Sequence, residues 1–506
     1  MQGWCGSSVT LPTDLRRTLA GILKADSGLE SRVDTESEVM GERILVVTAG
    51  LSGLLYSSVE LARRLAKVGH HVTYAGPATA RPLAEQHDLG FLALPPSQYD
   101  QFLEADATAG AIRRLVEVRR RRQRAAESMA VGGFVTALRQ LDPGLVLIDG
   151  EMHEHIIAAS GTGAPVALLN TFASIWRRPG LPPPHHLARP GFGWKGTRLG
   201  MWMLWLELRL RKQQKAALHR FRRVGCDRLS ILRHLGREAD FDLRRETDDS
   251  QWLIPFTYRR IPVLSLHALE FEFPHSPPDR VHYVGPMVLE PRNDRPMPPE
   301  DKGELEAVFE WRRRGEGRRR LVYVGFGSVF SSDLDLVRRL VGAVEMRPDW
   351  KLIISLSDRV TRDEIGRLPP GAHAFPWTPQ LRALRQADAC VTHGGINTID
   401  ECVLSGVPLL VYCGFETDMA GNTARVVHHG IGIAGDRDRD TTETIVGHVE
   451  RLMSEPTFDQ NLQRLRRDYE AYAENRVAER VVESLLHRLD SASHRNGSSS
   501  PDGDDG

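Results

Sequence analysis

The sequence has little cysteine and no long apolar run. Its 506 residues include five cysteines, and none of them forms a C-x-x-C pair. A small, odd number of cysteines without that spacing argues against a disulfide framework or a structural zinc site, and it fits a reducing cytoplasm. No segment reaches about 18 uninterrupted apolar residues, so we expect no transmembrane helix. The N-terminal stretch also lacks the apolar core of a signal peptide.

An excess of either charge is also missing. Lysine plus arginine equals aspartate plus glutamate, at 66 each, so no global field attracts nucleic acid or another polyanion. The arginine runs at 119–124 and 312–320 lack interleaved aromatic residues, and we expect no nucleic-acid binding. The apolar content of 41% is ordinary for globular domains, and the length favours two of them.

Strand-like and helix-like segments alternate along most of the chain, in two series. Each series opens with a short β-rich run that is followed by glycines and a helical pattern, which predicts a parallel sheet with right-handed crossovers. We therefore predict an α/β fold of two doubly wound, Rossmann-like domains. The predicted domains are 40–285 and 303–488, with a proline-rich linker at 286–302 and disordered extensions at 1–39 and 489–506. Translation starting at Met40 is a further hypothesis.

The stretch VTHGGINTIDE, at 391–401, carries the strongest chemical signal. It follows a predicted strand and opens a predicted helix that ends at Gly406. A glycine-opened helix N-terminus at the carboxyl end of a parallel strand is an anion site. Asn397 and Glu401 fall on one helical face, and a carboxylate there suits a ribose diol. Phosphate plus ribose indicates a nucleotide-sugar site, although an ordinary strand–turn–helix with an incidental histidine is the alternative.

Three neighbouring motifs extend this pattern: WTPQ at 377–380, GVP at 406–408 and DMAGN at 418–422. Together with 391–401 they resemble the signature of family 1 UDP-glycosyltransferases of the bacterial macrolide or carotenoid and plant secondary-metabolite types. The resemblance implies a GT-B fold, with the acceptor at the N-terminal domain and the donor at the C-terminal one. It also implies transfer of a hexosyl group, with inversion, from a UDP- or dTDP-sugar to a hydroxyl of a lipophilic small molecule. No cofactor and no metal are implied.

The resemblance also assigns the donor contacts, which comprise base stacking, ribose hydrogen bonds, diphosphate contacts and sugar hydroxyl contacts. Trp377 would stack on the base, and Gln380 and Glu401 would bond the ribose. The diphosphate would contact His393, Gly395, Asn397 and Thr398, and Asp418 would bond the sugar hydroxyls. The loop that contains Gly327 and Ser328 would close over the donor.

Two positions depart from the family pattern. Met419 stands where the family has a glutamine that bonds the sugar, so the identity of the sugar is open. Leu54 stands where the family has its histidine general base, and leucine cannot accept a proton. Asp149, which matches the aspartate that normally supports that histidine, is one candidate base, and His153 is another. His155 and the histidines of the 182–186 stretch are further candidates.

Residues 197–223 combine tryptophan and leucine with arginine and lysine. That composition suits a helix at a membrane surface or beside a lipophilic acceptor. We therefore expect a cytoplasmic protein, with peripheral contact at the inner membrane face as a variant, and a domain-packing helix as the plainer alternative. Because Leu54 is not a base, a catalytically silent nucleotide-sugar-binding protein is the second functional hypothesis. A nucleotide-sugar epimerase on the same fold is the third.

Overall fold

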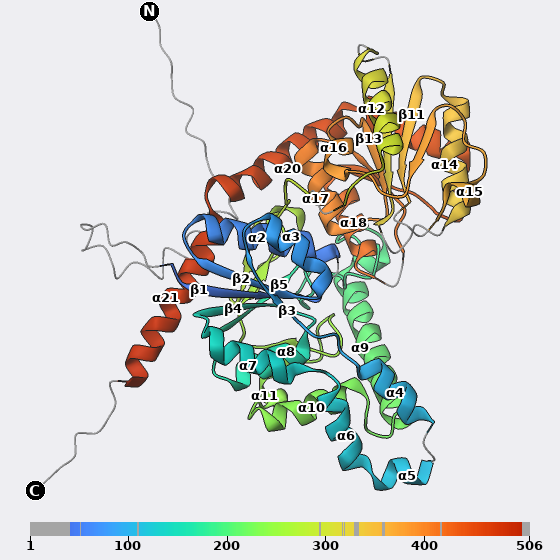
Figure 1. Ribbon diagram of the computed structural model, residues 1–506. Helices are drawn as coiled ribbons and strands as arrows, with labels where there is room; N and C mark the ends of the chain where they lie inside the picture. Colours follow the sequence, from blue (N-terminus) through green and yellow to red (C-terminus); the bar gives the residue numbers. More distant parts are fainter. Residues whose placement is uncertain are drawn as a thin grey trace, which may run out of the picture.

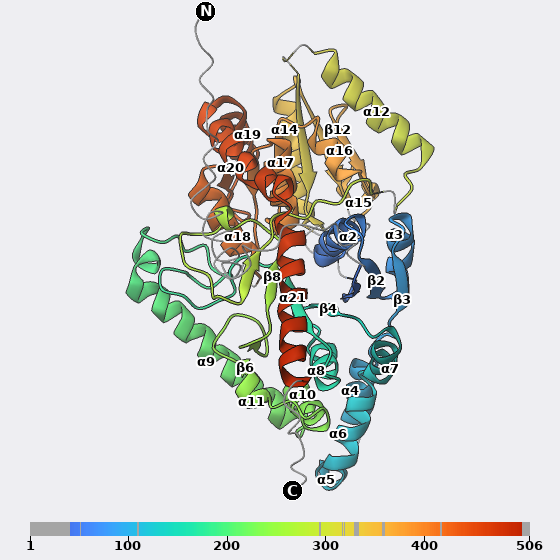
Figure 2. The same ribbon diagram turned by 90° about the vertical axis from the view of Figure 1, so that its left-hand side faces the viewer.

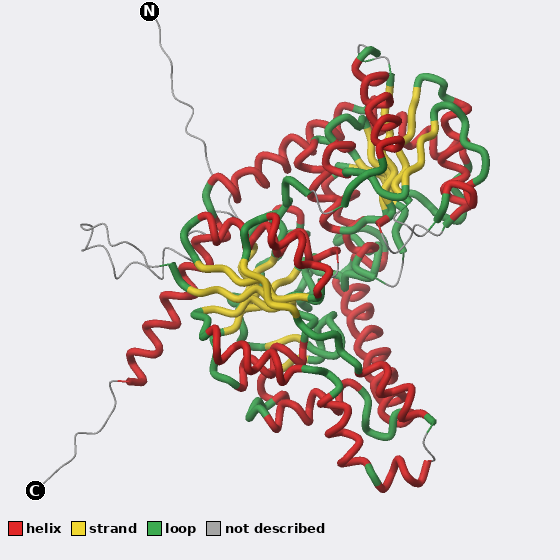
Figure 3. Tube along the Cα trace, in the orientation of Figure 1, coloured by secondary structure: helices red, strands yellow, loops and turns green. Residues whose placement is uncertain are grey.

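The computed structural model describes residues 41–497 except 51, 109–110, 293–294, 316, 318, 328–332, 357–359 and 415–416. Ser328 therefore lies outside the described residues. Two α/β domains are present, each built around its own parallel sheet with helices on both faces (Figures 1 and 3). Two Rossmann-like domains are the prediction made from the alternating pattern, and that prediction is confirmed.

The N-terminal domain holds a seven-stranded parallel sheet in the order β3-β2-β1-β4-β5-β8-β9. Every residue of β4 is buried, as expected for a central parallel strand covered on both faces. The strands are β1 Arg43–Val47, β2 His71–Gly76, β3 Gly90–Ala93, β4 Leu145–Asp149, β5 Val166–Asn170, β8 Val263–Ser265 and β9 Val281–Tyr283; a separate antiparallel pair is β6 Thr247–Asp248 and β7 Thr257–Tyr258. The helices are α2 Ser52–Lys67, α3 Arg81–Gln86, α4 Tyr99–Ala107, α5 Ala111–Val116, α6 Val118–Glu127, α7 Val131–Leu141, α8 His153–Gly161, α9 Arg198–Arg222, α10 Arg228–Glu238 and α11 Leu243–Glu246.

The C-terminal domain holds a six-stranded parallel sheet in the order β12-β11-β10-β13-β14-β15. The strand order reverses between β10 and β13, and such a switch point is where open α/β sheets bind ligands. The strands are β10 Arg320–Gly325, β11 Trp350–Ser355, β12 Ala372–Phe375, β13 Ala389–Thr392, β14 Leu409–Val411 and β15 Gly432–Ala434. The helices are α12 Pro299–Arg313, α14 Leu334–Met346, α15 Arg362–Ile365, α16 Gln380–Leu384, α17 Ile396–Ser405, α18 Met419–His429, α19 Thr442–Ser454 and α20 Pro456–Glu474.

The last helix, α21 (Val477–Gly497), crosses back to the N-terminal domain (Figures 1 and 2). Its Val482 and Leu485 belong to the same buried cluster as Ile44 of β1. The C-terminal segment therefore ties the two domains together. The helix also continues into 489–506, the segment that the sequence predicts to be unstructured. None of the helices in the described ranges is both long and apolar enough to cross a membrane.

A buried ion pair joins the two domains near their contact. Glu272 of the N-terminal domain accepts a hydrogen bond from Nε of Arg425 at 2.8 Å, and Nη2 of Arg425 lies 2.6 Å from the same carboxylate oxygen. Neither side chain is exposed at all. Glu272 also accepts hydrogen bonds from the Ser174 amide and from the Tyr283 hydroxyl. A fully buried charge of each sign is therefore compensated across the domain boundary.

Candidate functional site

The site is built on the turn from β13 to α17, at the switch point of the C-terminal sheet. Gly395 is the N-terminal cap residue of α17 in an extended conformation, with φ −65° and ψ 135°. Gly406 ends the helix in the left-handed region, at φ 70°. Both ends of the helix agree with the sequence prediction. The first turn of α17 thus presents free backbone N–H groups and a positive dipole end.

His393 lies in a space that two glycines leave open. A Cβ atom added at Gly327 would stand 2.7 Å from Cε1 of the imidazole, and one added at Gly395 would stand 2.7 Å from Nε2. Any side chain at either position would therefore displace the ring. Burial lowers the pKa of His393 to about 4, although a hydrogen bond to the Gly325 carbonyl acts in the opposite direction. The imidazole is neutral at pH 7, and it can offer a hydrogen bond but not a charge.

Gln380, Thr398 and Glu401 form a connected polar cluster beside this turn. The Gln380 amide donates to a Glu401 carboxylate oxygen at 2.6 Å and to the Thr398 hydroxyl at 3.3 Å. Glu401 is 1% exposed. The structure thus brings together the residues that the resemblance assigns to the ribose, and it fixes the carboxylate before any ligand arrives.

Arg292, in the linker between the domains, also bonds to Glu401. Its guanidinium carbon lies 4.4 Å from the ring centre of Tyr56, in α2 of the N-terminal domain. The arginine therefore connects the linker, the N-terminal domain and the predicted ribose-binding carboxylate. Sequence reasoning missed Arg292, because nothing in a proline-rich linker indicates which distant carboxylate an arginine will reach.

Asn397 connects the turn to the N-terminal domain. Its side-chain amide donates to the Gly53 carbonyl at 2.7 Å and accepts from the Ser57 hydroxyl at 3.2 Å. The first turn of α17 therefore faces the loop and helix that hold Leu54. The Leu54 side chain is 7% exposed and belongs to the hydrophobic core.

Asp418 and Trp377 stand on either side of this cluster in the chain. Asp418 accepts a hydrogen bond from Asn422 at 2.9 Å, and Asn422 also donates to the Gly394 carbonyl at 3.0 Å. Asp418 is therefore held next to the β13–α17 turn. Burial raises its pKa, against the hydrogen bond from Asn422. Trp377 is half-buried in the loop between β12 and α16.

Asp149 ends β4 and is buried. Its carboxylate accepts the Glu151 amide at 3.0 Å and bonds to the Ala49 amide, in the loop that leads to Leu54. Burial raises the pKa of Asp149, although these backbone hydrogen bonds oppose the shift. The carboxylate thus holds together the loops that follow β1 and β4, at the carboxyl edge of the N-terminal sheet.

His153 does not stand at that edge. Its imidazole is 1% exposed, with Nδ1 3.2 Å from the Tyr258 hydroxyl and Nε2 3.3 Å from the Ile254 carbonyl oxygen. Burial lowers its pKa to about 4. Both ring nitrogens are already occupied inside the domain, so we do not retain His153 as a candidate base.

Glu151 follows the end of β4 by two residues, and sequence reasoning missed it as a candidate base. Its side chain is accessible to solvent, yet surrounding protein removes part of its hydration. That burial raises the pKa of Glu151 to about 7, the charges of Asp149 and Asp418 act in the same direction, and Arg228 opposes them. Asp418 belongs to the C-terminal domain, so its charge acts on Glu151 across the domain boundary. The sequence signal that could have identified Glu151 is its position two residues after Asp149, the last residue of a strand.

The 182–186 stretch also reaches the C-terminal domain. The Gly421 amide donates to the Pro184 carbonyl at 2.6 Å, and a Cβ atom at Gly421 would lie 2.3 Å from that oxygen. The next residue, His185, accepts a hydrogen bond from the Trp252 indole at 3.2 Å, and burial lowers its pKa to about 4. This loop therefore borders the site beside Asp418. No group of three metal-ligating side chains occurs among the residues described.

Comparisons with known proteins show what the chain is similar to. Residues 339–486 match the model of the erythromycin biosynthesis protein CIII-like C-terminal domain. The oleandomycin glycosyltransferase of Streptomyces antibioticus is 28% identical over 221 residues, which are 42% of this chain and 50% of that protein. The ecdysteroid UDP-glucosyltransferase of Lymantria dispar multicapsid nuclear polyhedrosis virus is 32% identical over 41% of this chain and 39% of that protein. The chain is therefore similar in sequence to glycosyltransferases over a little less than half of its length.

Solved structures extend the likeness over nearly the whole chain. The glycosyltransferase of kitacinnamycin covers 89% of this chain and 99% of its own, with a TM-score of 0.61 and 23% identity. The glycosyltransferase VinC, solved in complex with dTDP, has a TM-score of 0.55 and 20% identity over 89% of this chain and 100% of its own. The fold of this chain is GT-B. In sequence, the matches span half or less of the first two curated relatives.

Proposed function

We propose that this GT-B protein is an inverting glycosyltransferase that moves a hexosyl group from a UDP- or dTDP-sugar to a hydroxyl of a lipophilic small molecule. The observation that carries the proposal is the cluster of Gln380, Thr398 and Glu401 beside the open first turn of α17. It combines ribose acceptors with an anion site at one switch point. The named relatives act on oleandomycin and on an ecdysteroid, which supports acceptors of the natural-product and sterol type.

In this proposal the donor lies along the carboxyl edge of the C-terminal sheet. Trp377 stacks on the base, and Gln380 with Glu401 bonds the ribose. The diphosphate accepts hydrogen bonds from the first turn of α17 and from neutral His393. These donors stabilise the charge that develops on the leaving diphosphate, and they do so without a metal. Asp418 bonds the sugar, whose identity depends on the change to Met419.

We propose Glu151 as the general base, with Asp149 as the residue that positions it. The acceptor hydroxyl loses its proton to the Glu151 carboxylate as its oxygen forms a bond to the anomeric carbon. The bond from that carbon to the diphosphate oxygen breaks on the opposite face, so the configuration inverts. A base with a pKa of about 7 suits this task at neutral pH.

The test of the donor site is a thermal-shift titration of the purified chain with UDP, dTDP, GDP and ADP. A ligand at 100 times its dissociation constant stabilises the folded state by about 2.7 kcal/mol. We expect UDP or dTDP to raise the melting temperature and ADP to leave it unchanged. If no nucleotide raises it, the donor assignment is wrong. Binding without turnover on any acceptor would favour the silent nucleotide-sugar-binding protein, the alternative that Leu54 raises.

Glu401→Gln is expected to weaken UDP binding about 10- to 100-fold, because a neutral amide replaces the carboxylate that accepts from the ribose hydroxyls. Isothermal titration with UDP measures the effect. Glu310→Gln is the matched control, since Glu310 lies on the exposed side of α12 in the same domain and pairs with Arg313 at 2.7 Å. Equal UDP affinity in both variants would show that Glu401 does not hold the ribose.

A further inference from the structure

The helix α9 has two apolar faces, and only one of them is packed. It runs along the outside of the N-terminal domain (Figures 1 and 2). Met201, Leu204 and Trp205 are buried, and the Trp205 indole donates to the Leu181 carbonyl at 2.8 Å. The opposite face exposes large apolar side chains at 38–83% of their area. They are Leu199, Trp202, Met203, Leu206, Leu210, Leu218 and Phe221.

These exposed residues recur mostly at intervals of three and four, so they form one stripe along the helix. The stripe cannot rotate inward, because Lys212 on the packed side donates to the carbonyls of Gln251 and Leu253 at 2.8 and 2.6 Å. The stripe is closely spaced from Leu199 to Leu210, is interrupted by the exposed Gln213 and Gln214, and resumes at Leu218. An exposed apolar stripe of this length marks an interaction surface. A helix that only packs two parts of a domain would carry polar residues there.

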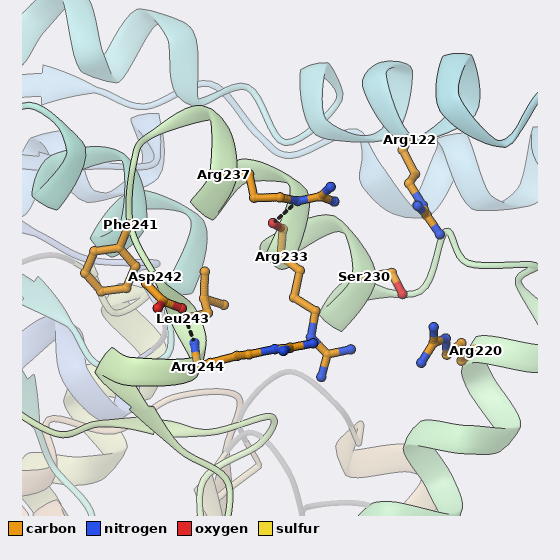
Figure 4. Close-up of a pocket in the computed structure, with 9 residues that line it drawn as sticks. All are labelled: Arg122, Arg220, Ser230, Arg233, Arg237, Phe241, Asp242, Leu243 and Arg244. Atoms are coloured by element: carbon orange, nitrogen blue, oxygen red, sulfur yellow. Dashed lines mark hydrogen bonds between the residues drawn. The ribbon is translucent and has the colours of Figure 1, made fainter.

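An arginine-lined cavity lies at the C-terminal end of the same helix. It has a volume of about 610 Å³ and is bordered by α6, α9, α10 and α11 (Figure 4). Five of the residues that line it are arginines, and one is a carboxylate, Asp242. The arginines are Arg122, Arg220, Arg233, Arg237 and Arg244.

The cavity carries a net positive charge, since five guanidinium groups face one carboxylate among its lining residues. Asp242 caps α11, with one carboxylate oxygen 3.0 Å from the Arg244 amide. Arg122 donates to the Gly225 carbonyl and Arg237 to the Arg233 carbonyl, and both of those acceptors are neutral. None of the five guanidinium groups pairs with a carboxylate of the described residues. Guanidinium groups in such numbers match the geometry of phosphate oxygens.

The cavity and the stripe meet on α9. Arg220 lines the cavity, and its neighbour Phe221 is 83% exposed. A second exposed apolar pair, Leu115 and Val116 of α5, belongs to the same end of the domain, where Arg114 donates to the Arg222 carbonyl at 2.9 Å. Apolar side chains beside phosphate-binding charges are complementary to a layer of anionic phospholipid.

We propose that the α9 stripe and the arginine cavity form one docking surface for a bilayer that contains anionic phospholipid. The stripe enters the acyl boundary, and the cavity receives a headgroup phosphate. The surface gives the 197–223 segment a defined partner and adds a lipid site to the proposed transfer reaction. The surface would also place a lipophilic acceptor near the site, because Trp205 of α9 bonds Leu181, one residue before the loop that borders the site. This last step rests on the proposed function. The docking itself does not depend on that function.

The experiment is co-sedimentation with vesicles of phosphatidylcholine alone and with about one third phosphatidylglycerol. We expect the wild-type chain to bind the anionic vesicles and to leave them at high salt. Arg233→Gln/Arg237→Gln/Arg244→Gln should lower the partition coefficient about 100-fold, at roughly fivefold for each charge. Leu206→Glu/Leu210→Glu should abolish binding to the anionic vesicles, because two added carboxylates can neither enter the acyl boundary nor approach an anionic surface.

Matched controls carry the same changes on the other domain. Met346→Glu replaces an apolar side chain that is 46% exposed, and Arg439→Gln removes an arginine that is 86% exposed. Both controls should bind vesicles as the wild type does. Nucleotide thermal shifts on every variant separate lost folding, or a failed donor site, from lost docking.

Three results would overturn the docking surface. The first is equal binding of the wild type and the arginine variant to anionic vesicles. The second is stabilisation by inorganic phosphate without any vesicle binding, which would assign the cavity to a soluble anion. The third is a wild-type dimer in sedimentation velocity that Leu206→Glu/Leu210→Glu converts to a monomer, because the stripe would then bind a second copy of the chain.

Discussion

Glu151→Gln is expected to lower kcat by about 10²- to 10⁴-fold, which is the usual contribution of a general base. The substitution keeps the shape of the side chain and removes its ability to take a proton from the acceptor. Because Glu151 does not hold the nucleotide in the proposed site, the affinity for UDP should be unchanged. Steady-state kinetics with a nucleotide sugar and a hydroxylated natural product, together with a UDP titration, measure both quantities.

The pH dependence gives an independent readout of the same group. Burial and the charges of Asp149 and Asp418 raise the pKa of Glu151 to about 7. Glu151 accepts a proton only when it is ionised, so activity should rise through pH 7, where it is about half-maximal, and level off about one unit higher. The residual activity of Glu151→Gln should lack this rise. A merely structural glutamate would change the rate without removing the titration.

Two further variants separate Glu151 from its neighbours. Asp149→Asn keeps one oxygen that can still accept the Glu151 amide, so it should reduce the rate less than Glu151→Gln does. Glu154→Gln is the matched control, because Glu154 pairs with Arg228 at 3.1 Å on the adjoining helix and has no proposed role. If Asp149→Asn abolished turnover and Glu151→Gln left it intact, Asp149 would be the base.

The sequence predicts the two sheets well because their strands are short, apolar and buried on both faces. It also predicts the C-terminal half of the site, because parallel strands bring their carboxyl ends to one edge. Gln380, Thr398 and Glu401 follow two such ends and meet as expected. These features depend on local periodicity and on one topological rule.

The features that the sequence does not reveal are contacts between distant segments. Glu151 acquires its raised pKa partly from Asp418, in the other domain. Arg292 bonds Glu401 from a linker that shows no regular pattern. His153 looks like a candidate base in the sequence because polarity is visible there, whereas the burial that ties up both its nitrogens is not. Tertiary packing decides each of these cases.

The Glu272–Arg425 pair is another such contact, and Glu272→Gln is expected to destabilise the chain by about 3–5 kcal/mol. The variant leaves the Arg425 guanidinium buried without an opposite charge, at a place where neither side chain is exposed. Thermal unfolding should show a fall in melting temperature of roughly 3–5 °C, because a chain of this length loses about 1 kcal/mol of stability for each degree near its midpoint. Replacing Arg425 by methionine in the same variant should recover part of the loss, since a neutral pair removes the uncompensated charge.

The pair should also appear in the acid stability of the wild type. Burial alone would raise the pKa of Glu272. Arg425 and His267 lower it by more than burial raises it, so the net pKa is below the ordinary value. The stabilisation is therefore present above the pKa of an unfolded glutamate, about 4.3, and is lost as pH falls through the lower folded pKa. Glu272→Gln should lack this acid-dependent term.

The matched control for this prediction is the surface pair of Arg43 and Asp142, whose side chains are 58% and 84% exposed and lie 3.0 Å apart. Asp142→Asn should change the free energy of unfolding by less than about 1 kcal/mol, because water and salt screen exposed ion pairs. Asparagine also tolerates the left-handed backbone at this position, where φ is 41°. If both substitutions had the same small effect, the Glu272–Arg425 contact would not hold the two domains together.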